Sequence, residues 1–178
     1  KVQLVGGDFG YRQIGLSASI ADSNQSHTIS FLDQAADGFI RNTDHELRTV
    51  FWQSAFNIKK SNWKINFGQN EKAFGAQNFY TARFPNQFEE TKTQFAALSG
   101  EMKVGNFTIK PKASVRKHND RFELFREDPD FYSRLPQGGF TDNFGDTVTF
   151  YNGHNYHQTK VYSTELNLAY KSFLGTTS

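Results

Sequence analysis

Residues 107–118 read Phe-Thr-Ile-Lys-Pro-Lys-Ala-Ser-Val-Arg-Lys-His, and their apolar and polar side chains alternate with a period of two. Successive side chains of a β-strand point to opposite faces, so this period predicts a strand with one apolar and one polar face. The stretch is longer than the ~5–6 residues of a typical strand in soluble proteins. It meets the ~9–11 residues that a tilted strand needs to cross a membrane.

The same period recurs along the chain and predicts an all-β fold. Four further stretches alternate clearly, at 11–20, 63–68, 91–104 and 159–171, and two alternate less regularly, at 28–34 and 46–58. No window keeps apolar residues at i, i+3, i+4 and i+7 over several turns, so no helix is predicted. We predict an antiparallel up-and-down meander of about eight long strands that forms part of a transmembrane β-barrel.

The connections between these strands are predicted to alternate in length. Ser61-Asn62 and Gly105-Asn106 are expected to form tight hairpin turns, and residues 21–27 a short polar turn. The longer connections are expected at about 37–45, 72–90 and 119–156, the last with a possible strand extension at 147–151. Short turns on one side and long loops on the other are typical of bacterial outer-membrane barrels.

The composition excludes several classes of protein and is compatible with a membrane barrel. Hydrophobic residues make up 37% of the 178 residues and aromatic residues 16%, which suits strands that are half apolar and half polar. The formal net charge of +2 is too small to indicate a nucleic-acid partner. The chain has no cysteine, so it contains no disulfide and no thiolate metal site. Its first residues do not form a signal peptide, so we expect any export signal to lie outside this chain.

Two alternatives to a section of a large barrel stay open. Alternation also describes the half-buried strands of a soluble ligand-binding or carbohydrate-binding barrel or sandwich. A small, complete eight-strand membrane barrel would serve as an adhesin or structural protein. Pro111 counts against a membrane strand paired on both edges, because it cannot donate a ladder hydrogen bond, and we expect a bulge or a local defect there.

Two short motifs, Gly7-Asp8-Phe9-Gly10-Tyr11 and residues 37–44, resemble those of TonB-dependent outer-membrane receptors, including Bacteroidota-type members grouped with cobalamin receptors. The first motif resembles the first hairpin of their barrel, and the second resembles their Asp-Gly-Tyr/Phe-x-x-Asn-x-Asp stretch. The likeness continues through four further segments, at 74–80, 86–91, 118–125 and 155–157. It covers most of the chain, and the order and spacing of the motifs carry it.

The resemblance implies uptake of a scarce, bulky ligand such as a ferric siderophore, cobalamin or a glycan. Such a receptor lies in the bacterial outer membrane, with a barrel of about 22 strands, an N-terminal plug domain and energy from the TonB complex. We expect 1–178 to be an N-terminal portion of the barrel. Its partners would be membrane lipid, the small-molecule ligand, and the plug, the remaining strands and the TonB-contacting segments beyond this chain. No enzymatic activity, cofactor or nucleic acid is expected.

The orientation of the strands follows from the membrane hypothesis. Apolar side chains should face lipid, and they are Ile14, Leu16, Ile20, Leu98, Met102, Ile109, Val115, Leu166 and Leu168. Charged side chains should face an aqueous lumen, and they are Lys64, Glu101, Lys110, Lys112, Arg116 and Glu165.

Aromatic and arginine residues of the two longest loops are the candidate ligand-binding residues. They offer stacking faces and positive charges to a bulky ligand. The candidates are Phe79, Tyr80, Arg83, Phe122, Arg126, Tyr132, Arg134, Phe150 and Tyr151. The alternative, which we favour for much of the 119–156 loop, is that its aromatic residues pack the loop upon itself.

Metal binding and catalysis have weaker support, and we predict neither. His154 and His157 lie near Asp142 and Asp146 in sequence, but loop residues of these types more often form turn hydrogen bonds. Asp37, Asp44 and Glu46 could bind calcium, although their spacing does not match an EF-hand. Glu123 with Glu127 or Asp128 could form a glycosidase pair, but acidic pairs are common in polar loops.

Overall fold

The computed structural model describes residues 1–172 and 175–177 and consists of two antiparallel β-sheets. The described residues contain no helix, and therefore no helix long and apolar enough to cross a membrane. The large sheet contains β1 (Val2–Gly6), β2 (Arg12–Ala21), β3 (Gln25–Ala36), β4 (His45–Ile58), β5 (Ser61–Gly75), β6 (Phe88–Val104), β7 (Phe107–Glu123), β11 (Asn155–Ser172) and β12 (Gly175–Thr177). The small sheet contains β8 (Tyr132–Arg134), β9 (Phe140–Asp142) and β10 (Thr147–Val148).

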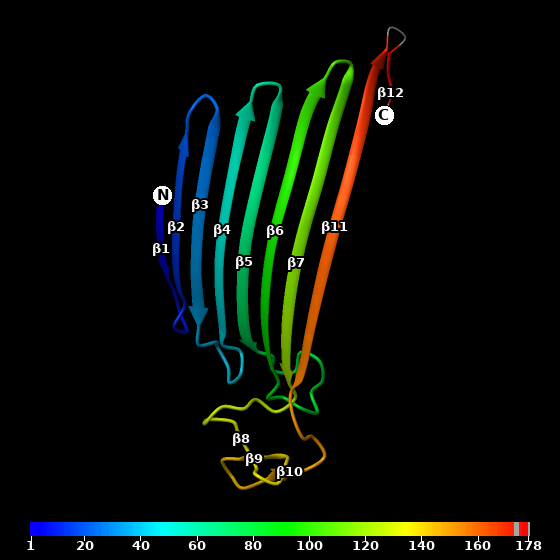
Figure 1. The fold of residues 1–178 in the computed structure, drawn as a ribbon. Coiled ribbons are helices and arrows are strands. Elements are labelled where there is room, and N and C mark those ends of the chain that lie inside the picture. The colour runs from blue at the N-terminus through cyan, green and yellow to red at the C-terminus, as the bar shows by residue number, and fades with distance from the viewer. Residues whose placement is uncertain (173–174, 178) are drawn as a thin grey trace.

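The large sheet is an up-and-down meander, as predicted. Its strand order is β1-β2-β3-β4-β5-β6-β7-β11-β12, and every neighbouring pair is antiparallel. Short turns lie at one end of the sheet, and the long connections lie at the other with the small sheet (Figure 1). The predicted asymmetry of the connections is therefore confirmed.

The structure corrects several boundaries. The turn between β4 and β5 is Lys59-Lys60 rather than Ser61-Asn62, because Ile58 pairs with Ser61 and Lys59 has a positive φ of 54°. The three long connections are shorter than predicted and span 37–44, 76–87 and 124–154. Of the expected extension at 147–151, only β10 is a strand, and it belongs to the small sheet.

Register across the large sheet separates two faces. Residues directly opposite one another form a row and share a face. One row is almost wholly apolar and contains Ala18, Ile29, Trp52, Phe67, Ala96, Val115 and Tyr162. The next row along the strands lies on the other face and contains Ser19, Thr28, Gln53, Asn66, Ala97, Ser114 and Ser163. We call these the apolar face and the polar face.

No second layer of the described residues covers the apolar face. Ile20 is 72% exposed and Leu166 is 62% exposed, and Leu98 and Leu168 are exposed as well. Among residues 1–172, the only large buried hydrophobic side chains are Phe125, Phe131 and Phe140, all in the 124–154 connection. The sheet therefore has no core of its own, and a small core lies among the loops.

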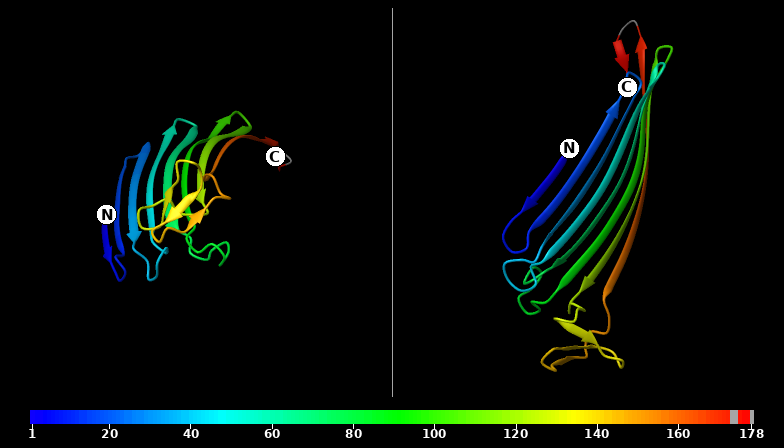
Figure 2. Two further views of the ribbon diagram at one scale, coloured as in Figure 1. Left: turned by 90° about the horizontal axis from the view of Figure 1, so that it is seen from below. Right: turned by 90° about the vertical axis from the view of Figure 1, so that its left-hand side faces the viewer.

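The polar face is the concave one. The sheet is curved across its width, and its concave side faces away from the viewer of Figure 1 (Figure 2). In β2, which runs upward in that view, the N–H and C=O of Ser17 both bond to Lys1 on the viewer's left. An L-residue so placed carries its side chain away from the viewer, into the concavity. The exposure of the β2 side chains agrees with this assignment, since Gln13 and Ser17 are half-buried while Ile14 and Leu16 are exposed.

Pro111 coincides with an interruption of the ladder, as expected. It pairs with Leu166 in β11, but on the β6 side the described pairing passes from Ser99–Lys112 directly to Met102–Ile109. The register is the same on both sides of the gap, so the defect is a local loss of pairing and not a bulge.

Candidate functional site at the long-loop end

A polar clamp joins the three long connections. The Arg126 guanidinium donates from Nη1 to Oδ1 of Asp44 (2.6 Å) and from Nη2 to Oδ2 (2.9 Å). Nη1 also donates to Oδ1 of Asn42 at 3.0 Å. The same guanidinium lies 4.8 Å from the ring centres of Phe88 and Phe131. Planar, charge-assisted contacts of this kind fix geometry better than a single ammonium contact.

Asn42 joins the middle connection, 76–87, to this clamp. Its buried side chain donates from Nδ2 to the carbonyl oxygens of Pro85 (3.1 Å) and Gln87 (2.7 Å). Its backbone has a positive φ of 62°, a conformation that asparagine tolerates better than most residues. The segment 37–44 thus holds both 76–87 and 124–154 in place.

Most aromatic residues of the 124–154 connection pack against one another. Phe125 is the centre of this aromatic cap, with Tyr132, Phe150 and Tyr151 at ring-centre distances of 5.1, 5.9 and 5.8 Å. Phe140, on β9, is fully buried and stacks on Phe125 at 6.3 Å. For Tyr132 and Tyr151 the loop therefore packs upon itself, as the alternative interpretation expected.

A carboxylate network anchors the cap to the end of β7. The Glu123 side chain is 1% exposed, forms an ion pair with Arg121 and accepts the backbone N–H of Glu127 at 2.6 Å. Glu127 in turn contacts Arg134 at 3.0 Å and His154 at 2.7 Å. The hydrogen bond from Arg134 lowers the pKa of Glu127, and the bond from His154 lowers it further, against partial burial.

Four aromatic side chains form a second, more exposed feature, the aromatic ridge. Successive ring centres of Phe74, Phe79, Tyr80 and Phe122 lie 6.3, 4.8 and 5.3 Å apart, all edge to face. Phe79 is 69% exposed and Tyr80 is 55% exposed. Phe79 and Tyr80 therefore keep aromatic surface that a ligand could contact, whereas Phe74 and Phe122 are half-buried.

Charged groups flank the ridge. The Lys72 ammonium lies 4.3 Å from the centre of the Phe74 ring. The Tyr80 hydroxyl donates to the Glu89 carboxylate, and this bond, with burial and the negative charge, raises the pKa of Tyr80 to about 12. The ridge therefore offers stacking surfaces beside one cation and one anion.

Strand register places the ridge at the mouth of the concavity. Phe74, Glu89 and Phe122 lie in one row at the loop ends of β5, β6 and β7. Lys72 lies on the same side of the sheet, on the polar face. A ligand held by the ridge would stand where the loops meet the polar concavity.

The structure divides the predicted ligand-binding residues among these features. Phe79, Tyr80 and Phe122 meet in the ridge, Arg126 belongs to the clamp, and Tyr132, Arg134, Phe150 and Tyr151 belong to the cap. Arg83 lies apart, 5.4 Å from the ring of Phe84. Sequence reasoning missed Phe74, Lys72 and Glu89, which only the pairing of β5 with β6 could have identified.

Several of the residues considered for metal or acid–base chemistry have other partners. Asp142 accepts the N–H groups of Phe144 and Asp146 at 2.9 Å each, as expected for a turn. Within residues 1–172 and 175–177, no three acidic or histidine side chains are grouped to hold a metal ion. Asp44 is bound by Arg126, and Glu123 accepts the backbone N–H of Glu127.

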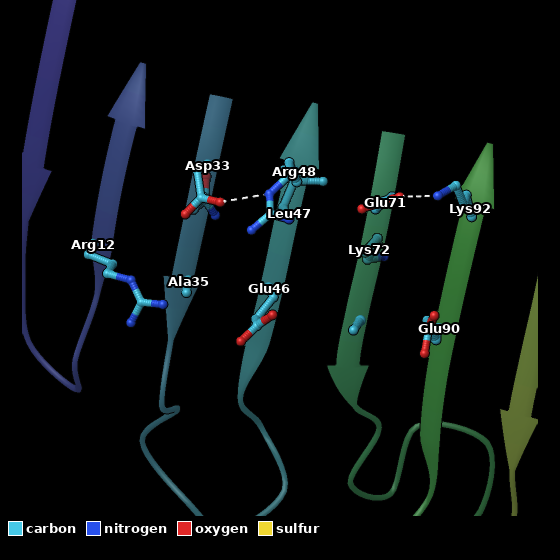
Figure 3. A pocket seen from close by; sticks show the side chains of 12 residues that line it. Arg12, Asp33, Ala35, Glu46, Leu47, Arg48, Glu71, Lys72, Glu90 and Lys92 are labelled. Atoms are coloured by element: carbon cyan, nitrogen blue, oxygen red, sulfur yellow. Dashed lines mark hydrogen bonds and ion pairs between the residues drawn. The ribbon is translucent and has the colours of Figure 1, made fainter. Parts of the chain in front are cut away.

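Charged rows separate the apolar residues from the loops on the apolar face. A hollow of about 410 Å³ lies there. Figure 3 shows the ion pairs Arg48–Asp33 (3.0 Å) and Lys92–Glu71 that cross it. Opposite charges neutralise one another within these rows, so the hollow marks where the apolar surface gives way to water.

Comparison with protein-family models, with curated proteins and with solved structures finds no match for this chain.

Proposed function

We propose that the chain forms part of the wall of a transmembrane β-barrel in the bacterial outer membrane. The apolar face would meet lipid, and the polar, concave face would line an aqueous lumen. The observation that carries this proposal is the uncovered apolar face on the convex side of a sheet of long strands.

The apolar band runs obliquely across the register, which supports a membrane plane cutting tilted strands. The row of Leu16 continues through Phe31 and Val50, and then becomes polar at Gln69, Gln94, Lys117 and Lys160. At the other boundary, Leu166 pairs with Pro111, whereas the same row ends at Gln25 in β3. Strands of a barrel are tilted and staggered, so a flat hydrocarbon layer crosses each at a shifted position.

The height of the band agrees with this orientation. On β11 it runs from Tyr162 to Tyr170, so roughly 9 residues lie within it, near the ~9–11 needed for a tilted crossing. The two tyrosines bracket Leu166 and Leu168, and aromatic rings at both borders are typical of membrane interfaces.

The shape of the sheet counts against a soluble barrel or sandwich. A soluble barrel buries its apolar side chains inside, yet here the concave face is polar, with Ser17, Ser114 and the Lys112–Glu165 ion pair (3.1 Å). A sandwich needs a second sheet over the apolar face, and the small sheet lies at the loop end instead (Figure 1).

We further propose that the barrel belongs to a TonB-dependent receptor that binds and takes up a bulky ligand, without catalysing a reaction. The ridge at the mouth of the polar concavity supports a ligand with planar or apolar groups. The clamp supports the resemblance, because Asn42 and Asp44 of the family-like segment organise the loops. A plug domain and the TonB complex are its proposed partners, as is membrane lipid.

Cysteine labelling tests the membrane orientation directly, because the chain has no native cysteine. Single variants Val115→Cys and Leu166→Cys on the apolar face are compared with Ser114→Cys and Ser163→Cys on the polar face, all in lipid vesicles. A charged maleimide should label the polar-face cysteines far faster, while a lipid-soluble reagent should show the reverse order. Equal labelling of both faces by the charged reagent would refute the proposal.

A further inference from the structure

Two lysines face each other on the apolar face without a counter-ion. Lys117 of β7 and Lys160 of β11 are directly opposite in the antiparallel ladder. Like charges in this position destabilise a strand pair. Among the residues that the structure describes, neither forms an ion pair, whereas Arg48, Lys92 and Arg121 on the same face all do.

The lysine pair lies at the border of the apolar band. On the side of the short turns, the next row of the same face contains Val115 and Tyr162, and both side chains are exposed. On the side of the loops, the next row of the same face contains Asn119 and Gln158, which are joined by a 2.8 Å hydrogen bond. The charges therefore lie one step outside the surface that would meet lipid tails.

A hollow lies beyond the pair on the side of the loops; neither lysine lines it, but Asn119 and Gln158, the next residues on the same face, do. It has a volume of about 510 Å³, and Lys92, Asn119, Tyr156 and Gln158 contribute to its lining. Of its two acidic lining residues, Glu90 contacts Arg121 at 3.5 Å, whereas Asp120 belongs to a row of the polar face. Ammonium, amide and phenol groups together offer hydrogen-bond donors to an anion.

We infer that Lys117 and Lys160 bind the phosphate of a membrane lipid in the leaflet on the long-loop side. The inference rests on the proposed membrane orientation, which puts lipid phosphates at this height. An anion between the ammonium groups removes the repulsion within the pair, and the hollow accommodates the rest of the headgroup. A lipid is favoured over free phosphate because Val115 and Tyr162 provide an adjoining surface for its acyl chains.

Lipid retention measured by native mass spectrometry tests the site. The chain is purified in detergent micelles doped with phosphatidic acid or, separately, with phosphatidylcholine, whose choline group neutralises the phosphate. The double variant Lys117→Gln/Lys160→Gln should bind phosphatidic acid about 30-fold more weakly, because each basic residue near a membrane surface strengthens binding by about fivefold. The control Lys64→Gln/Lys103→Gln removes the same charge from the polar face and should retain the lipid as the unsubstituted chain does.

Three other outcomes would overturn the lipid site, and a fourth would refute the barrel. Equal weakening in the control would assign retention to net charge and overturn the site. Displacement by inorganic phosphate at the concentration of the lipid would show an anion site without lipid preference, and would also overturn it. Unchanged retention in the Lys117/Lys160 variant would refute the inference while leaving the barrel proposal standing, provided that the cysteine variants label as expected. Failure of that labelling would refute the barrel proposal itself.

Discussion

Arg126 and Asp44 lie 82 positions apart in the sequence and meet through two parallel hydrogen bonds at 2.6 and 2.9 Å. The Arg126 side chain is only 13% exposed, so this contact is partly shielded from water. It joins the first long connection to the last, and Asn42 extends the contact to the middle one. The loop end thus has a fixed arrangement although it lacks a large core.

Replacing Arg126 with lysine should loosen all three connections. Lysine cannot reproduce the two parallel hydrogen bonds to Asp44 or the planar contacts with Phe88 and Phe131, so we expect a loss of about 1–3 kcal/mol in the free energy of local opening. Hydrogen exchange of amides in 76–87 and 124–154 measures this loss. Arg134→Lys is the matched control, because its ion pair with Glu127 is exposed and should contribute only ~0–1 kcal/mol. Equal effects from both variants would contradict a clamp at Arg126.

The Tyr80 hydroxyl should titrate unusually late. Its hydrogen bond to Glu89, with burial and the negative charge, raises its pKa to about 12. Glu89→Gln removes the charge, so the pKa of Tyr80 should fall toward 10, as read from the ring-carbon shift of isotopically labelled tyrosine. Glu90→Gln should leave it in place, since Glu90 lies on the opposite face and contacts Arg121. An unchanged value in Glu89→Gln would mean that the two groups do not interact.

The cap at the loop end should weaken in acid. The Arg134 hydrogen bond, aided by His154, lowers the pKa of Glu127 in the folded chain below its ordinary value of 4.5. Such a carboxylate stabilises the fold fully above that value, and its contribution disappears as the pH falls through the folded pKa. Proteolysis of residues 124–154 should therefore accelerate below about pH 4.5. In Glu127→Gln this acid dependence should be smaller, and an identical profile would refute the assignment.

Much of the sheet could be predicted from the sequence because alternation is a local property of each strand. The prediction ended strands too early where polar or charged residues occupy both faces, as at Glu71–Lys72 and at Asn119–Asp120, since hydropathy no longer alternates there. The Lys59-Lys60 turn was missed because lysine at a positive φ is uncommon, whereas Ser61-Asn62 has a turn-like composition.

For the site, the types of residue could be predicted from the sequence, but their grouping in space could not. The aromatic content of the loops indicated stacking residues, but it could not separate the ridge from the cap. Phe122 joins Tyr80 across 42 positions, and Phe125 stacks on Phe140, and neither contact leaves a local periodicity. The strands of the small sheet are three residues long or shorter, too short for alternation to be detected.

Gly68 should tolerate no side chain while Phe95 is beside it. A Cβ at Gly68 would lie 2.2 Å from the Phe95 ring, which lies over Gly68 on the polar face with its centre 6.3 Å from that of Phe51. Gly68→Ala should cost about 1–3 kcal/mol of unfolding free energy in urea titrations, and Phe95→Leu in the same chain should recover part of it. Gly15→Ala is the control, since its nearest atom would be 3.5 Å away. Equal stability of the two alanine variants would show that the Phe95 ring moves aside freely.

A lysine introduced at Leu16 distinguishes a membrane-facing band from an ordinary amphipathic sheet. Leu16 shares its row with Gln94 and the native Lys117, but the oblique band places Leu16 well inside the apolar surface and Gln94 at its border. Leu16→Lys should therefore cost ~2–4 kcal/mol in urea unfolding from lipid vesicles, and Gln94→Lys only ~0–1 kcal/mol. Ser17→Lys, which points into the polar concavity, should cost little. Similar losses for Leu16→Lys and Gln94→Lys would mean that the band follows the strand register, and no tilted membrane plane would then be needed to explain it.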